Sequence, residues 1–452
     1  MEFTGKRRQL IVLITTILGS TVVLLDGTIV NLALPKIASD LHANFAGLQW
    51  ITDGYLLSLS ALILLGGSLG DIFGRKKIYL IGLIGFGVSS LICALAPTVI
   101  LLIAARFIQG IFGALLVPGA LAIINTNFQP KVRGQAIGRW TAWLSIGTIL
   151  GPLVGGLILS VASWRWIFLI NLPLIALCVV LARPSIIETK DEEVRHVDYV
   201  GAGLAALSLA GITAGLIEGP VTHWAPWTII SLIVGVALLT LFIAFENRKR
   251  DPLVRLSLFK SRNFTGSNLM TFLLYGALSG FIFALVIYLQ TSMHYSSLQA
   301  GFSLLPLSFL MFVFAGRVGK LSAVYGPRLF MTIGPLLAGL GIALLYSLQP
   351  GDSYWAGVLP GALLFSAGMV LTVAPLTSTV MASVHNHDSG IASGINNAVS
   401  RAAGLIVVAF LGLAGTSNFY HFSIALCAIL ALVSGIVSFL VIEKVPSAKL
   451  KK

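Results

Sequence analysis

The sequence predicts an all-α polytopic membrane protein with fourteen spanning helices, and three observations lead to this fold class. Of its 452 residues, 57% are hydrophobic and only 10% are charged, whereas a soluble domain carries about 25% charged residues. The apolar residues form runs of the length, about 20 residues, that a helix needs to cross a bilayer. Most Lys and Arg residues lie in short connectors between these runs. We therefore expect lipid, rather than water, to surround most of the chain.

Fourteen apolar runs are long enough to be spanning helices. In chain order they are 10–33, 47–70, 78–96, 98–125, 137–160, 164–183, 199–218, 226–245, 264–290, 299–320, 328–347, 355–377, 391–414 and 421–442. The third and fourth runs are separated by little more than Ala96, Pro97 and Thr98.

Two charged connectors divide the chain into three predicted parts. The connectors 184–198 and 246–263 bracket the seventh and eighth runs. The expected organisation is an N-terminal six-helix half (1–183), an inserted two-helix segment with its cytoplasmic connectors (184–263) and a C-terminal six-helix half (264–452). The segments GGSLGDIFGRKKIYLIG and GRVGKLSAVYGPRLFMTIG lie at corresponding places in the two halves and share their glycine spacing. Repeated halves are typical of transporters, whose substrate site lies between them, although a chance resemblance is the alternative.

The positions of Lys and Arg predict the orientation. If the N-terminus is inside the cell, the outward connectors hold only Lys36 and Arg165, and Arg106 and Arg401 lie within runs. All the others among the 29 basic residues then fall on the inner side, as the excess of Lys and Arg in cytoplasmic loops requires. We expect a multi-pass protein of the cytoplasmic membrane with both termini in the cytoplasm. The net charge of +13 is explained by this topology, so no nucleic-acid partner is expected.

The sequence predicts no enzyme, metal or cofactor. Cys93, Cys178 and Cys427 fall within apolar runs and are interpreted as small hydrophobic residues rather than as disulfide partners or metal ligands. No catalytic triad or phosphate-binding loop is present, because glycine-rich segments such as GLIGFG lie inside runs with no strand before them. A proton gradient is the expected energy source. The segment 6–8, KRR, leads into a long run without a cleavage site, so no signal peptide is expected.

Three ionisable residues are expected at one depth of the N-terminal half. Asp26 lies about nine residues before Pro35, Asp53 about six residues into the second run, and Arg106 about eight residues into the fourth. At a rise of 1.5 Å per residue, all three lie about 9–14 Å below the outer surface. A charge within a membrane requires a partner or a water-filled cavity. These three residues could therefore pair with one another.

Such a layer could exchange a proton for a cationic substrate. Burial and a like-charged neighbour favour the protonated form of a carboxyl, whereas an arginine favours the ionised form. An ionised carboxylate attracts a cation, and a proton removes that attraction. The alternative is a structural role, in which Asp26 only hydrogen-bonds backbone near Asn31 or pairs statically with Arg106.

Six motifs resemble the major facilitator superfamily and, within it, the fourteen-span drug:proton antiporters. They are LLDGTIVNLALP, GSLGDIFGRKK, RFIQG, GTILGPLVGG, WRWIFLINLP and SGINNAVSRAAG. The resemblance covers almost the whole chain and implies the major facilitator fold, with two six-helix halves plus two inserted central helices. It also implies a proton-coupled antiporter that exports hydrophobic, cationic drugs or toxic compounds by alternating access and confers antibiotic resistance. The role of the family's proton-coupling arginine would fall to Arg106. Two departures are Ile72, where the family often has arginine, and the short outer connector 415–421.

The loop between the second and third runs is predicted to act as a gate. Glycine permits a tight turn there, and the resemblance implies that the loop is a latch that holds one conformation. Its residues are Gly67, Asp71, Gly74, Arg75 and Lys76. Ordinary cytoplasmic topology is the alternative, and it explains Lys76 better than Asp71.

The fifth run carries a predicted hinge. Small residues let helices approach closely, and a proline bends a helix by removing a backbone hydrogen bond. The residues are Gly147, Gly151, Pro152, Gly155 and Gly156. Plain helix packing is the alternative.

Several other residues are candidates for lining a substrate cavity. They are Tyr55, Trp140, Trp143, Glu218, Phe283, Tyr288, Gln290 and Arg401. Glu218 lies near the outer end of its run, where an interfacial position is the alternative. The expected partners are a hydrophobic or cationic small molecule, protons and the bilayer, and the protein is expected to be a monomer.

Two other functions remain open from the sequence. One is an exporter of a specific metabolite, lipid or anionic compound, with Arg106 and Arg401 as anion ligands. The other is a non-transporting membrane sensor or scaffold, in which the buried carboxylates are static.

Overall fold

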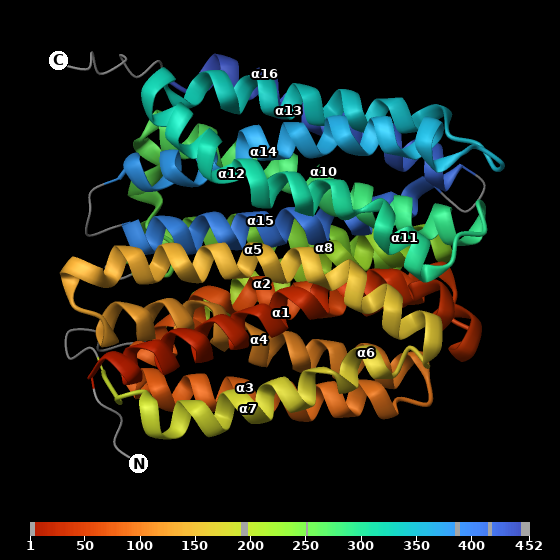
Figure 1. The fold of residues 1–452 in the computed structure, drawn as a ribbon. Helices are drawn as coiled ribbons and strands as arrows, with labels where there is room; N and C mark the ends of the chain where they lie inside the picture. Colours follow the sequence, from red (N-terminus) through yellow and green to blue (C-terminus); the bar gives the residue numbers. More distant parts are fainter. Residues whose placement is uncertain (1–4, 191–197, 250–251, 385–388, 415–417, 444–452) are drawn as a thin grey trace. The chain divides into compact units, whose positions relative to one another are not determined.

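The computed structural model describes residues 5–190, 198–249, 252–384, 389–414 and 418–443, with the side chains of Lys6, Ser389 and part of the fifth helix excepted. Helices make up nearly all of this part of the chain, which contains no strand. The α-helices are α1 (Gly5–Leu41), α2 (Phe45–Phe73), α3 (Arg75–Leu95), α4 (Val99–Asn127), α5 (Pro130–Val161), α6 (Trp166–Leu169), α7 (Asn171–Ser185), α8 (Tyr199–Val221), α9 (Pro226–Arg248), α10 (Arg262–Thr291), α11 (Ser297–Ser303), α12 (Leu305–Tyr325), α13 (Pro327–Leu344), α14 (Leu359–Ala382), α15 (Ser389–Leu411) and α16 (Phe419–Val441). Figure 1 shows them along the chain.

Thirteen helical stretches in the described residues are long and apolar enough to cross a membrane, which confirms the all-α membrane fold. They coincide with thirteen of the predicted runs. The remaining run, 137–160, lies within α5, in which Gly151–Val161 is a shorter apolar helix of described residues. The split between the third and fourth runs is also confirmed, because α3 ends at Leu95 and α4 begins at Val99.

Some predicted runs are not single regular helices. The run 164–183 is divided into α6 and α7 at Ile170, and the run 299–320 into α11 and α12. In the second case Pro306 lies in the first turn of α12, where its missing N–H costs no intrahelical bond. A proline at that place ends the preceding helix because it cannot continue the backbone hydrogen bonding.

The chain forms two compact units, each of which is described by itself. Unit 1 comprises Met1–Phe245, Arg250–Leu253 and Ser296–Leu298 and contains α1 to α8 and α9 up to Phe245. Its most extensive helix packing is between α2 and α4. In addition, α3 packs on α4, α5 and α7 pack on α1, and α8 packs on α2. A Cβ atom on Gly110 would lie 2.4 Å from the Tyr55 backbone oxygen, so only glycine permits the approach of α4 to α2.

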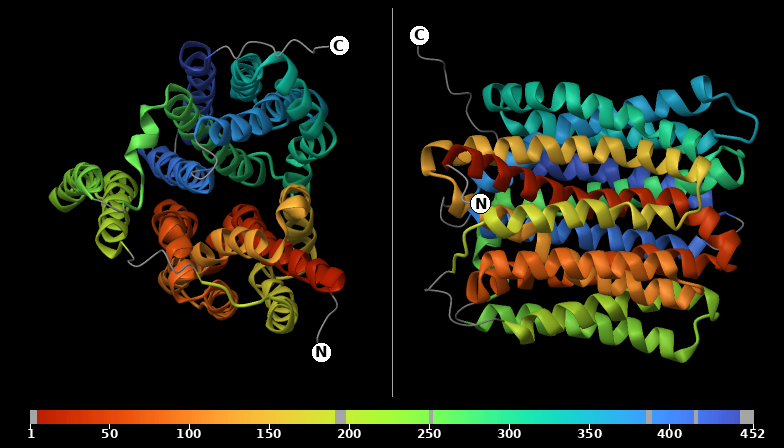
Figure 2. Two further views of the ribbon diagram at one scale, coloured as in Figure 1. Left: turned by 90° about the vertical axis from the view of Figure 1, so that its left-hand side faces the viewer. Right: turned by 60° about the horizontal axis from the view of Figure 1, so that its bottom comes forward.

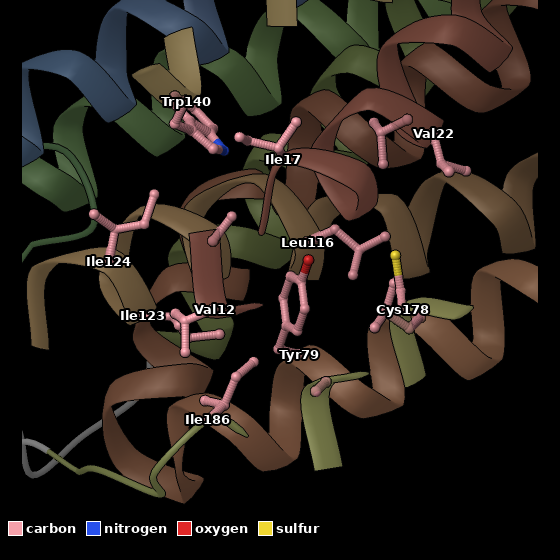
Figure 3. Close-up of a cluster of buried hydrophobic side chains, with 14 of the residues drawn as sticks. Val12, Ile17, Val22, Tyr79, Leu116, Ile123, Ile124, Trp140, Cys178 and Ile186 are labelled. Carbon is pink, nitrogen blue, oxygen red and sulfur yellow. The ribbon is translucent and has the colours of Figure 1, made fainter. Parts of the chain in front are cut away.

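An apolar core fills unit 1 between α1, α3, α4, α5 and α7. Val12 and Ile17 of α1 and Leu116 of α4 all belong to it (Figure 3). Tyr79 of α3 reaches the core with its ring and donates its hydroxyl hydrogen to the Thr15 backbone oxygen at 3.0 Å. Such bonds satisfy polar atoms that neither lipid nor the apolar core could satisfy.

Trp140, a sequence candidate for the substrate cavity, lies in this same core. It is 7% exposed, and its indole N–H donates to the Thr16 backbone oxygen at 3.3 Å. The structure therefore gives Trp140 a packing role between α5 and α1.

Unit 2 comprises Glu246–Lys249, Val254–Tyr295 and Gln299–Lys452. In it α13 packs on α14 and α16, α10 packs on α15 and α16, and α12 packs on α14. Within each unit the long helices run nearly parallel or antiparallel to one another (Figure 2). The two units group the helices of the inserted segment with the N-terminal ones, and the three-part division at 183 and 263 remains a prediction.

Candidate functional site

Asp26 and Arg106 form an ion pair in the interior of unit 1. Asp26 comes from α1 and Arg106 from α4, and each is 1% exposed. The Arg106 Nη1 atom donates to Asp26 Oδ2, and its Nε atom donates to the Ile51 backbone oxygen at 3.1 Å. The guanidinium carbon lies 4.2 Å from the centre of the Tyr55 ring, a cation–π contact. Tyr55 thus packs beneath the arginine and donates its own hydroxyl hydrogen to the α1 backbone.

Three neutral polar residues complete this site, and none of them was predicted. Gln109 Nε2 and Asn171 Nδ2 donate to Asp26 Oδ1 at 3.0 and 3.1 Å. The same two nitrogens donate to Ser90 Oγ at 2.8 and 3.1 Å. Gln109 also accepts from Arg106 Nη1 at 2.6 Å. We call Asp26, Ser90, Arg106, Gln109 and Asn171 the Asp26 cluster, which joins α1, α3, α4 and α7.

One signal in the sequence indicated part of the cluster. Gln109 follows Arg106 by three residues, so the two side chains share a helix face. Ser90 and Asn171 gave no such signal, because they lie on other helices, and the sequence does not show which helices pack together.

Asp53 lies outside the Asp26 cluster. It comes from α2 and is 0% exposed, yet neither carboxyl oxygen has a hydrogen-bond partner among the described residues. The expectation that the three ionisable residues would pair with one another therefore holds only for Asp26 and Arg106. Buried polar groups in folded proteins are nearly always hydrogen-bonded, so an unpaired buried carboxyl calls for an explanation.

The predicted gating loop is held by two sets of contacts. Arg75 binds Asp71 through Nη2 at 2.7 Å and Nε at 2.8 Å, so Asp71 pairs within its own loop rather than capping α3. Glu188, which was not predicted, accepts from the backbone N–H groups of Lys76 and Lys77 at 3.0 Å each. A carboxylate at this position accepts hydrogen bonds from free N–H groups and interacts favourably with the positive end of the α3 dipole. Gly74 has a φ of 111°, which glycine adopts without strain.

The remaining loop residue contacts an adjacent helix. A Cβ atom on Gly67 would lie 3.6 Å from the Pro118 side chain, an ordinary contact between α2 and α4. A latch function for the loop remains a prediction.

The predicted hinge in α5 faces α1. Cβ atoms on Gly151 and Gly155 would lie 2.4 Å from Thr28 Oγ1 and 2.9 Å from Ile29 Cγ2. Pro152 lies inside the helix between them. These contacts explain why small residues are needed, while bending at Pro152 remains a prediction. The surroundings of Gly147 lie outside the described residues, and Gly156 is buried on the same helix.

The other candidate cavity residues are scattered. In unit 1 Trp143 is 54% exposed, and Glu218 accepts a hydrogen bond from the Trp50 indole at 2.7 Å. In unit 2 Phe283 is buried, and the Tyr288 ring stacks on Tyr420 with centroids 3.7 Å apart. Gln290 and Arg401 are partly buried. Of these residues, Phe283 and Tyr288 both pack on the first residues of α16, Phe419 and Tyr420.

Helices long enough to cross the membrane, with ionisable side chains buried between them, indicate a multi-pass membrane protein with a candidate functional site in its interior. The sequence model of the Major Facilitator Superfamily matches residues 16–409, and the chain belongs to that superfamily. It is accordingly a transporter rather than an enzyme.

Named relatives agree with this assignment, and solved structures share the fold. The chain is 33% identical over 408 residues to "Multidrug resistance protein Stp" of Mycobacterium tuberculosis, covering 90% of this chain and 76% of that protein. It is 33% identical over 408 residues to "Puromycin resistance protein pur8" of Streptomyces alboniger, covering 89% and 81%. A peptide transporter POT in complex with sulfate shares the fold, with a TM-score of 0.70, 16% identity and coverage of 96% and 94%. The human organic anion transporter MFSD10 does so with a TM-score of 0.63, 17% identity and coverage of 97% and 100%. The major facilitator fold is confirmed.

Proposed function

We propose that the protein is a proton-coupled exporter of hydrophobic, cationic drugs, and that Asp53 is the residue that exchanges the proton. The superfamily and the relatives named for multidrug and puromycin resistance support drug efflux. The observation that supports the coupling residue is the full burial of Asp53 without a hydrogen-bond partner among the described residues.

The argument for Asp53 rests on the cost of a buried charge. An ionised carboxylate without a partner costs several kcal/mol in a protein interior, and a proton or an organic cation removes most of that cost. Both ligands neutralise the same group, so they compete for it. When that competition is coupled to alternating access, one proton enters for each cation expelled.

The Asp26 cluster has a different part in this proposal. Asp26 already has a cationic partner and two amide donors, so its charge is compensated in place. We assign it the role of holding α1, α3, α4 and α7 together while the protein changes conformation.

Transport in proteoliposomes tests the proposal. The probe is ethidium, with uptake driven by an imposed pH gradient and with passive counterflow measured in parallel. We expect Asp53→Asn to lower gradient-driven uptake at least about tenfold, which corresponds to about 1.4 kcal/mol of coupling, and to leave counterflow near the wild-type rate. Asp352→Asn removes a carboxylate from an exposed loop of unit 2 and serves as the matched control.

Two results would overturn the proposal at different points. Gradient-driven uptake that survives in Asp53→Asn would remove Asp53 from the coupling step. Ethidium transport by the wild type that does not respond to the gradient would remove proton coupling altogether, and a neutral or anionic compound preferred over ethidium would change the substrate class.

The proposed setting is the cytoplasmic membrane, with both termini and the gating loop in the cytoplasm and the protein acting as a monomer. The concentration of Lys and Arg on one side supports this orientation. We expect Lys249→Cys to react with an impermeant thiol reagent only after the cells are opened. The native cysteines Cys93, Cys178 and Cys427 are buried and should not interfere. Labelling of intact cells would reverse the orientation.

A further inference from the structure

A second site that could hold a ligand lies at the end of unit 1 where α2 and α4 begin and α8 ends. A cavity of about 360 Å³ opens there, and none of its lining residues belongs to the Asp26 cluster. The residues that carry the argument are Trp50, Val99, Ile103 and Glu218. This volume is within the range of about 300–1,000 Å³ that small-molecule sites occupy.

The cavity carries a negative charge that is held in place. Glu218 is the only acidic residue among those lining it, and no Lys or Arg lines it. The Trp50 indole N–H donates to Glu218 Oε1 at 2.7 Å, and the Trp50 ring packs on Phe107 with centroids 6.0 Å apart. The Glu218 carboxylate is thus held at the N–H edge of the Trp50 ring, and that ring in turn packs on Phe107.

This combination is the one that binds organic cations. An aromatic face attracts an ammonium group through its quadrupole, and a carboxylate adds a charge-assisted contact. The aliphatic side chains of Val99 and Ile103 supply an apolar wall for the substituents. We propose that this cavity is a binding site for an ammonium cation with apolar substituents, held by Glu218 and Trp50 and separate from the exchange site at Asp53.

Two sources could supply such an ammonium group: a free organic cation or the amine headgroup of a lipid. The site lies at the helix ends, where either has access. The chemistry of recognition is the same in both cases, so the proposal concerns the ammonium group, and the source is decided by the lipid composition used in the test.

Binding can be followed at Trp50 itself. The protein, labelled with 5-fluorotryptophan at its eight tryptophans, is titrated with benzyltrimethylammonium in nanodiscs of phosphatidylglycerol, and Trp50→Phe assigns the fluorine resonance. We expect a saturable shift of the Trp50 signal in the wild type and a dissociation constant at least about tenfold higher in Glu218→Gln, since the charge-assisted contact is lost. Ala43→Phe, which narrows the cavity without touching Glu218, should also weaken binding. The other fluorine resonances report whether each variant is folded.

Two further experiments test whether this site is independent of Asp53 and identify the source of the cation. Asp53→Asn should leave the Trp50 titration unchanged, because Asp53 does not line the cavity. If the lipid amine is the natural occupant, adding phosphatidylethanolamine to the nanodiscs should lower the affinity for benzyltrimethylammonium in the wild type but not in Glu218→Gln. If the occupant is a free cation, the added lipid should leave that affinity unchanged. No saturable shift in the wild type, or one that Glu218→Gln and Ala43→Phe leave intact, would overturn the proposal.

Discussion

Two carboxylates buried on α1 and α2 of unit 1 have opposite surroundings. Asp26 accepts hydrogen bonds from Arg106, Gln109 and Asn171. Asp53 is buried as fully, at 0% against 1% exposed, and accepts none from the described residues. The difference teaches that depth in the membrane alone does not decide what a carboxylate does. A carboxylate with a cationic partner and hydrogen-bond donors stabilises the helix packing, whereas one without partners can be neutralised by a ligand.

The largest expected effect on stability comes from breaking the ion pair of Asp26 and Arg106. Arg106→Met leaves the Asp26 charge buried without its cation, and removal of one partner of a buried ion pair costs about 3–5 kcal/mol. We expect a loss of that size in the free energy of unfolding, measured by denaturation of the purified protein in detergent. The double variant Asp26→Leu with Arg106→Met should be more stable than Arg106→Met alone, because no unpaired charge remains. A double variant as unstable as the single one would show that the ion pair is not the cause.

A smaller loss is expected when one neutral member of the cluster is removed. Gln109→Leu takes a donor from Asp26 and an acceptor from Arg106, and buried polar atoms left unsatisfied cost about 1–3 kcal/mol. The matched control is Gln129→Leu, since Gln129 is exposed before α5 and makes no capping bond with its side chain. Equal melting temperatures for the two variants would contradict the network described for Gln109.

The sequence predicted the spans and the depth of the ionisable residues because both depend on local quantities. Apolar run length and the rise per residue of a helix are the same in every context. Rotation about the helix axis was not included in that estimate. Tyr55 faces Arg106, and Asp53, two residues earlier, is turned by about 200° around α2, so the shared depth of Asp53 and Arg106 did not bring them together.

The partners supplied by distant segments could not be predicted in this way. Asn171 reaches Asp26 across 145 positions of sequence, and Glu188 reaches the backbone of Lys76 across 112. An isolated asparagine or glutamate in one sequence carries no pattern that names its partner. Helix packing determines these contacts, and hydropathy describes which residues are buried but not which helices are neighbours.

A half-buried ion pair at the end of α2 extends the comparison. Asp71 and Arg75 form a pair of the same chemistry as Asp26 and Arg106, with side chains 30% and 15% exposed. Because solvent screens such a pair, Asp71→Asn should lower the free energy of unfolding by less than about 1 kcal/mol. If the loop is a latch, turnover of ethidium should nevertheless fall while ethidium affinity stays the same. Unchanged turnover would leave the loop with only its topological role.

The smallest expected effect on stability is that of Asp53→Asn, because the Asp53 side chain has no hydrogen-bond partner among the described residues. Asparagine has nearly the shape of aspartate, and no described residue donates a hydrogen bond to Asp53, so Asp53→Asn deprives no neighbouring donor of its acceptor. The substitution also removes the cost of ionising a buried group. We expect a melting temperature equal to or above that of the wild type, together with the loss of gradient-driven transport. Asp26→Asn, measured beside it, should melt at a lower temperature because Arg106 is left unpaired. If Asp53→Asn were destabilised as strongly as Asp26→Asn, Asp53 would have a structural partner in the folded protein, and the distinction between the two carboxylates would fail.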